Sequence, residues 1–171
     1  AMQRRRFLTL SGSGALALSS KWTQFSEGGQ QLPAKSLLRL AGMTLDELRR
    51  RLEHVLFEVY LPFWDKHGID HELGGFMCAT DHDGTLVNTD KFHWFQGRGI
   101  WVYSYLYNHF EKNQQYLEIA RKTKDFLVKY AVQTDGWWAA LLARGGRILT
   151  PFQGDIYGML FAAEGFQEFA Q

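Results

Sequence analysis

The sequence contains one cysteine, Cys78, so no disulfide can form within the chain. It also lacks any run of about 18 consecutive apolar residues, and an ordinary membrane-spanning helix is therefore not predicted. The 19 Lys and Arg residues nearly balance the 18 Asp and Glu residues, so the composition gives no argument for nucleic-acid binding. A glycine-rich phosphate-binding loop and a GxSxG nucleophile motif are both missing, which removes the usual sequence signs of nucleotide binding and serine-based hydrolysis.

Residues 65–83 are rich in histidine and acidic side chains, but their spacing does not fit a metal site. Zinc needs three or four converging ligands, and the compact HExxH and CxxC patterns are absent. The stretch DHDG at residues 81–84 resembles part of a calcium loop, yet its glycine stands too early and the glutamate that closes such a loop is missing. We therefore expect neither a metal nor a cofactor, and interpret the segment as a hairpin with strands at residues 76–79 and 86–87.

What the sequence does contain is a large share of aromatic residues. Hydrophobic residues make up 46% of the 171 positions and aromatic residues 15%, which fits a folded globular protein and not a disordered one. This length predicts a single domain with a real core. The aromatic content suggests carbohydrate contact, although aromatic cores are more common.

Residues 91–107, KFHWFQGRGIWVYSYLY, form the most informative stretch. Their apolar residues recur with the period of an amphipathic helix. Gly97 and Gly99 lie inside this predicted helix, where each costs about 1 kcal/mol relative to alanine. We expect them to leave room for another backbone, or for a ligand, beside Arg98.

Arg98 is the candidate binding residue of this helix. Trp94 precedes it by one helical turn and should therefore lie on the same helical face. An indole beside a guanidinium suits a sugar, because the ring packs on C–H groups while the planar fork of donors binds oxygen atoms. The alternative is a structural arginine that pairs with a buried carboxylate.

A helix is also predicted ahead of this stretch. Thr44 and Glu47 have the spacing of a capping box, so the fold should begin there. Apolar residues then follow helical spacing until Pro62, which should end or kink the helix near Leu61.

Further elements are predicted after the central helix. Residues 116–130 carry the apolar stripe of another amphipathic helix. Residues 137–143 and 147–150 flank a Gly-Gly pair and are interpreted as the two strands of a hairpin. Asp155 is a predicted N-cap for a last helix.

Several motifs in series resemble segments of the N-acylglucosamine 2-epimerase family. WFQGRGIWVYSYLYN is similar to the family's W-x-QGR-x-x-W segment, and FWDKHGIDHELGGFMCATDHDGTLVNTDKF resembles the segment before it. LEIARKTKDFLVKY, DGWWAALLARGGR and GDIYGMLFAAEGFQEFA resemble the segments that follow. The likeness covers residues 45–171, and ordered motifs are far more specific than QGR alone. The family includes cellobiose 2-epimerases and aldose–ketose isomerases that act on mannose-type sugars.

The resemblance implies an all-α fold, the (α/α)6 barrel, to which residues 44–171 would contribute the N-terminal part with small β-hairpins at helix connections. It implies sugar epimerisation or isomerisation through an enediolate, without a catalytic metal. Arg98 takes the place of the arginine that binds the sugar oxygens, Trp94 that of a substrate-contacting tryptophan, and Tyr157 that of an aromatic site residue. The two proton-transferring histidines would lie beyond Gln171, so this segment alone is expected to be inactive.

Two other function classes stay open. A glycoside hydrolase on the same barrel needs two carboxylates across the scissile bond, and Asp155 and Glu164 are the candidates. A non-catalytic sugar-binding domain needs neither those acids nor the histidines. The expected partner is a small-molecule sugar and the assembly considered is a homodimer; neither nucleic acid nor a membrane anchor is expected.

Residues 1–20 have the pattern of a twin-arginine export signal. The run RRRFL at residues 4–8 fits RRxFL, a weakly apolar stretch follows, and ALA at residues 15–17 offers a cleavage site. Residues 21–43 are interpreted as a linker because they are rich in serine, glycine and glutamine. The protein is therefore expected in the periplasm, with the cytoplasm as the location if the signal is not used.

Overall fold

The structure is a computed structural model that describes residues 39–171. The predicted export signal and most of the predicted linker lie outside the described residues, and both stay predictions. The chain divides into two compact units, Ala1–Glu47 and Leu48–Gln171. None of the helices within the described part is long and apolar enough to cross a membrane.

The described part of the first unit begins with a small hairpin. β1 (Arg39–Leu40) pairs antiparallel with β2 (Met43–Thr44). The turn between them has positive φ angles at Ala41 and Gly42, 51° and 78°. Glycine adopts this backbone region freely, whereas alanine does so rarely, so the tight turn determines the conformation of Ala41.

The predicted capping box is confirmed at the start of the first helix. The N–H of Thr44 donates to the Glu47 carboxylate at 2.8 Å, and the N–H of Glu47 donates to the Thr44 hydroxyl at 3.2 Å. The helical run that follows consists of α1 (Leu45–His54), a π-helical turn η1 (Val55–Tyr60) and α2 (Leu61–His67).

Pro62 was expected to end or kink this helix near Leu61; the structure shows a change of helix type at Leu61 and no end. The run continues to His67, and the N–H of Leu61 donates to the carbonyl of Leu56, five residues back. Proline has no N–H to donate, but it is tolerated in the first turn of a helix. The widened turn before Pro62 starts a new helical segment, so the proline falls in a first turn.

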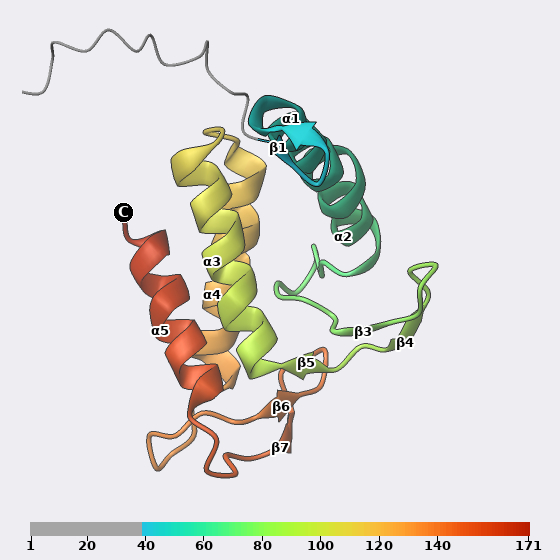
Figure 1. Ribbon diagram of the computed structural model, residues 1–171. Helices are drawn as coiled ribbons and strands as arrows, with labels where there is room; N and C mark the ends of the chain where they lie inside the picture. Colours follow the sequence, from blue (N-terminus) through green and yellow to red (C-terminus); the bar gives the residue numbers. More distant parts are fainter. Residues whose placement is uncertain (1–38) are drawn as a thin grey trace, which may run out of the picture. The chain divides into compact units, whose positions relative to one another are not determined.

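Three helices form the main body of the second unit. α3 (His93–His109), α4 (Gln114–Tyr130) and α5 (Tyr157–Phe169) run side by side (Figure 1). The central helix is confirmed, but it begins at His93 and not at residue 91. The two preceding residues form a strand, β5 (Lys91–Phe92), because they pair with a distant segment of the chain.

Short strands join the helices, as predicted. β3 (Ala79–Thr80) pairs with β4 (Leu86–Asn88), and β6 (Leu141–Leu142) pairs with both β5 and β7 (Ile148–Thr150). The first of these strands was expected to begin at Phe76. It begins later because a glutamine side chain, and not a strand, takes up the hydrogen bonds of the Phe76 backbone.

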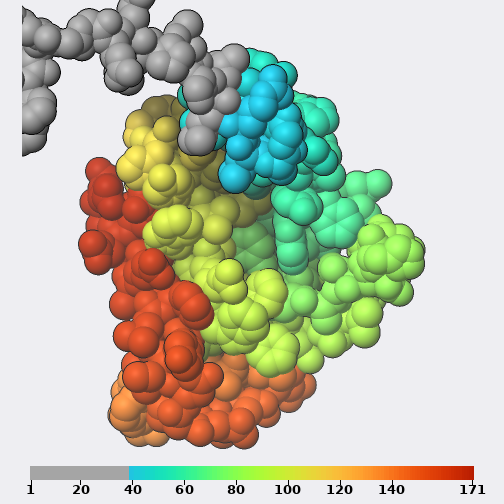
Figure 2. Space-filling view, viewed as in Figure 1, coloured from blue at the N-terminus to red at the C-terminus, as the bar shows by residue number. Residues whose placement is uncertain are grey.

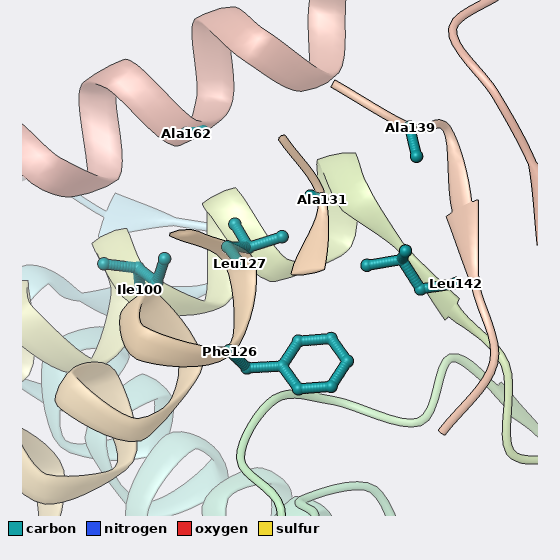
Figure 3. Close-up of a cluster of buried hydrophobic side chains, with 7 residues drawn as sticks. All are labelled: Ile100, Phe126, Leu127, Ala131, Ala139, Leu142 and Ala162. Atoms are coloured by element: carbon teal, nitrogen blue, oxygen red, sulfur yellow. The ribbon is translucent and has the colours of Figure 1, made fainter. Parts of the chain in front are cut away.

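α3 is buried against two hydrophobic clusters. The cluster drawn in Figure 3 joins α3, α4, α5 and the hairpin, through Ile100, Phe126, Leu127, Ala131, Ala139, Leu142 and Ala162. The second joins α3 and α4 to the turn after α2, through Ile69, Phe76, Tyr103, Leu106, Ile119 and Ala120. The remaining face of α3 carries exposed residues, among them Trp94 and Arg98.

Glycines bring α3 and α5 together. A Cβ at Gly97 would lie 2.5 Å from the backbone nitrogen of Ala162, and one at Gly165 would lie 2.5 Å from the carbonyl oxygen of Gly97. The expected room for another backbone is therefore confirmed at Gly97. At Gly99 the space is instead filled by an aromatic ring, that of Phe76.

Gly97→Ala should lower the free energy of unfolding by about 2 kcal/mol or more, because the added methyl group would meet backbone atoms that cannot rotate away. This loss outweighs the gain of about 1 kcal/mol in helix propensity. Chemical denaturation of the complete protein measures the change. Gly145→Ala is the control, since a Cβ there would meet nothing within 4 Å. Equal stability of the two variants would show that α3 and α5 separate without cost.

Candidate functional site

Arg98 lies in the second turn of α3, and its side chain is exposed. Its guanidinium carbon lies 5.8 Å from the centre of the Trp94 ring and 5.4 Å from the centre of the Phe161 ring. Both distances are within the range of cation–π attraction. Trp94 precedes it on the same face of α3, as predicted, whereas Phe161 belongs to α5. Aromatic rings from two helices therefore hold this cation.

No hydrogen bond or ion pair within residues 39–171 involves the Arg98 guanidinium. The structural alternative, an arginine paired with a buried carboxylate, is therefore wrong for the described part of the chain. The buried carboxylate of Asp70 is paired with Lys91 and Arg144 instead. Since its donors are not engaged, the planar fork of Arg98 can hold two ligand oxygens at once.

Tyr157 is the first residue of α5 and is 67% exposed. It precedes Phe161 by one helical turn, so the two side chains lie on the same face of α5. Because Phe161 contacts Arg98, this face of α5 is the one turned toward the cation. The structure thus places Tyr157 one turn away from the ring that packs on Arg98.

A cavity of about 420 Å³ lies beside Arg98. Half of the residues that line it are aromatic and come from the first helical run, from the turn after α2 and from α3: Tyr60, Trp64, Phe76, Phe95 and Tyr103. Among the described residues that line it, Arg98 alone is charged. In Figure 2 the yellow-green surface of α3 lies between α5 in red and residues 48–67 in teal.

A buried ion pair lies beneath the start of α3. Lys91 Nζ donates to Asp70 Oδ2 at 2.9 Å, and the two side chains are 0% and 1% exposed. Lys91 also donates to the carbonyls of Gly74 and Arg144, at 2.7 and 3.1 Å. The Arg144 guanidinium donates to both oxygens of Asp70, at 2.8 and 3.0 Å. The network ties the turn after α2 to β5 and to the β6–β7 hairpin.

The contacts of this network shift the pKa values of Asp70 and Lys91. Burial alone would raise the pKa of Asp70, but hydrogen bonds from Arg144, from the N–H of Leu73 and from Lys91 hold it well below its usual range. Burial lowers the pKa of Lys91, and the hydrogen bond and charge of Asp70 oppose that shift. Sequence reasoning missed this network. Two sequence features could have indicated it: Lys91 stands directly before the aromatic helix, and Asp70 stands shortly before the pair Gly74-Gly75.

His93, the first residue of α3, is buried. Its ring is 3% exposed and lies 5.4 Å from the ring of Trp138. Burial lowers its pKa, with smaller opposing effects from the backbone of Gly158 and the charge of Asp155.

Trp138 packs against the cluster of Figure 3, whereas its neighbour Trp137 is 43% exposed.

The remaining candidates do not converge on one site. The N-cap of α5 is Ile156 and not the predicted Asp155, but Asp155 Oδ1 accepts a hydrogen bond of 2.9 Å from the N–H of Tyr157 and so supports the start of the helix. Glu164 is exposed two turns further along α5. No group of three or more His, Cys, Asp or Glu residues in the part of the chain that the structure describes could hold a metal ion.

Comparison with known proteins assigns this chain to a family. The sequence model of the N-acylglucosamine 2-epimerase (GlcNAc 2-epimerase) family matches residues 74–170, which include Trp94, Arg98 and Tyr157. The N-acylglucosamine 2-epimerase of Mus musculus is 38% identical over 108 residues, 61% of this chain and 26% of that protein. A cellobiose 2-epimerase of Bacteroides fragilis is 30% identical over 129 residues, 73% of this chain and 32% of that protein.

A solved structure shows the same fold. The cellobiose 2-epimerase from Bacillus thermoamylovorans superposes with a TM-score of 0.65 at 22% identity, over 73% of this chain and 32% of its own. Its fold is the (α/α)6 barrel, so the predicted fold class is confirmed. This chain spans about a quarter to a third of the length of the relatives it matches. It belongs to the N-acylglucosamine 2-epimerase family.

Proposed function

We propose that the protein containing this chain is a sugar 2-epimerase or aldose–ketose isomerase that acts through an enediolate. One observation supports this most strongly. The QGR arginine, Arg98, is an exposed cation held between two aromatic rings, and no carboxylate within the described residues engages it. This arrangement suits a neutral, oxygen-rich substrate better than it suits a structural ion pair.

The proposed reaction needs such a cation. Removing the proton next to a sugar carbonyl places negative charge on the carbonyl oxygen, and a fixed guanidinium near O1 and O2 stabilises that charge. A base with a pKa near neutrality must remove the proton, and histidine suits this role. The buried ring of His93 is not assigned to it, and no other histidine of this chain is.

Each predicted site residue has a proposed role. Arg98 binds the sugar oxygens and stabilises the enediolate. Trp94 packs against the sugar ring and against the guanidinium, and Tyr157 contacts the substrate from the start of α5. Support for these roles comes from two observations: Trp94 and Arg98 lie on one face of α3, and the face of α5 that carries Phe161 and Tyr157 is turned toward Arg98. The proposed partner is a small-molecule sugar; the homodimer stays a prediction.

Solvent exchange tests the mechanism directly. The complete protein should be incubated in D₂O with N-acetylglucosamine, cellobiose or mannose, and the products examined by NMR. An enediolate route incorporates deuterium at C2 of an epimerised sugar, or at C1 of the ketose when the reaction is an aldose–ketose isomerisation. Release of new reducing ends without exchange at C2 would instead support the glycoside hydrolase alternative. Saturable sugar binding without either reaction would support a binding domain.

Export by the twin-arginine route is proposed from RRRFL at residues 4–8 alone. Replacing Arg4 and Arg5 with lysine should block periplasmic appearance of a reporter fused after Ser20, because this pathway recognises the arginine pair itself. Arg6→Lys is the matched control, since Arg6 occupies the free position of the pattern. Equal export of the double-lysine variant would remove the assignment.

A further inference from the structure

Gln96 is fully buried, and its amide pairs with both backbone groups of Phe76. Its Oε1 accepts the N–H of Phe76 at 2.6 Å, and its Nε2 donates to the Phe76 carbonyl at 2.9 Å. A neighbouring strand satisfies a backbone with the same two kinds of bond. Nε2 also lies 3.1 Å from the carbonyl of Phe92, which anchors the amide to the start of α3. Gln96 therefore fixes the backbone of Phe76 to α3.

Glycines permit this close approach. Gly75 has a φ of +91°, and a Cβ there would lie 2.7 Å from Gln96 Oε1. On the other side, any Cβ at Gly99 would overlap the ring of Phe76. The turn at Gly75 brings the backbone of Phe76 to Gln96. Because Gly99 has no side chain, it leaves a notch in the surface of α3, and the ring of Phe76 fills this notch.

The ring of Phe76 is held as firmly as its backbone. It is 5% exposed and stacks on Tyr103, with ring centres 5.6 Å apart and an interplanar angle of 29°. Gln96, Gly99 and Tyr103 follow one another at helical spacing, so they form one cradle along α3. The side chain that fills this cradle comes from outside the helix.

The cradle lies directly beside Arg98. Phe76, Gly99 and Arg98 line the same cavity. The rings of Trp94 and Phe161 support the guanidinium, but no hydrogen bond within residues 39–171 fixes its rotamer. The ring of Phe76 occupies the space over Gly99, the residue next to Arg98 in the chain.

We propose that Phe76 is a positioning residue for Arg98, held by Gln96 and by the notch at Gly99; its catalytic consequence rests on the proposed function. The Phe76 ring keeps the guanidinium on the side of Trp94 and Phe161. Gln96 in the QGR motif thereby has a role distinct from that of the arginine. It binds the backbone of Phe76, and the ring of Phe76 orients Arg98.

Two variants of the complete protein test this. Phe76→Leu removes the ring. Gly99→Ala displaces the ring without substituting Gln96, Phe76 or Arg98. Phe126→Leu is the matched control, since Phe126 is 2% exposed in the cluster of Figure 3 and does not line the cavity. Labelling of Arg98 by phenylglyoxal, measured by peptide mass spectrometry, should rise about threefold or more in both variants as the guanidinium gains other rotamers.

The exposed Arg147 is the internal reference for labelling, and kcat and KM are measured on the same preparations. We expect kcat/KM to fall about tenfold or more in both variants, mainly through kcat, because a misplaced cation no longer meets the developing charge. Labelling of Arg98 at the wild-type rate in both variants would overturn the proposal. A wild-type protein without sugar turnover would overturn the proposed function alone, since labelling still decides whether Phe76 positions Arg98.

Discussion

Arg98→Lys should remove most of the sugar turnover of the complete protein while leaving its fold intact. Lysine keeps the positive charge but loses the planar fork that holds two oxygens at once. If Arg98 stabilises the enediolate, kcat/KM should fall by roughly 2–4 kcal/mol in transition-state free energy. Little stability should be lost, because the guanidinium makes no hydrogen bond or ion pair within the described residues.

Turnover and thermal unfolding should be measured on one preparation of each variant. Arg147→Lys is the matched control, because Arg147 is also exposed but lies in the β6–β7 hairpin away from Trp94 and Phe161. Unchanged turnover in Arg98→Lys would remove the catalytic role. A large fall in melting temperature, with normal activity in the folded fraction, would instead show that the two aromatic contacts matter for the fold.

Local features of the fold were predictable from the sequence, because they depend on residues close together in the chain. The capping box needs only Thr44 and Glu47, and the amphipathic helices need only their own periodicity. The two hairpins follow from turn residues between short apolar runs. The pairing of Arg98 with Trp94 belongs to the same class, since both lie on one turn of α3.

Features that join distant segments were not predictable in this way. The pairing of β5 with β6 converts the first residues of the expected helix into a strand, and the partner lies about fifty residues later. The role of Gln96 depends on Phe76, and the second ring on Arg98 comes from Phe161. The sequence motif identified Arg98 but could not show what orients it, since the orienting groups belong to other elements.

The buried pair of Lys91 and Asp70 is the strongest case of this kind, and it carries the last prediction. Asp70→Asn should lower the free energy of unfolding by about 3–5 kcal/mol at neutral pH, because removing one partner of a buried ion pair leaves the other charge uncompensated. Lys91 is fully buried, so water cannot replace the lost carboxylate. Chemical denaturation measures the change, and Glu118→Gln, which alters an exposed ion pair, should change stability little.

The pH dependence and a double variant separate this ion pair from simple loss of packing. Because the folded-state pKa of Asp70 lies below its ordinary value of 3.8, its stabilisation is fully present above that pH and is lost as the pH falls below it. The difference between wild type and Asp70→Asn should therefore shrink in acid. Adding Lys91→Met to Asp70→Asn should recover about half of the lost stability or more, since the unpaired buried charge is gone. A double variant less stable than Asp70→Asn would mean that Lys91 stabilises the fold through Gly74 and Arg144 and not through Asp70.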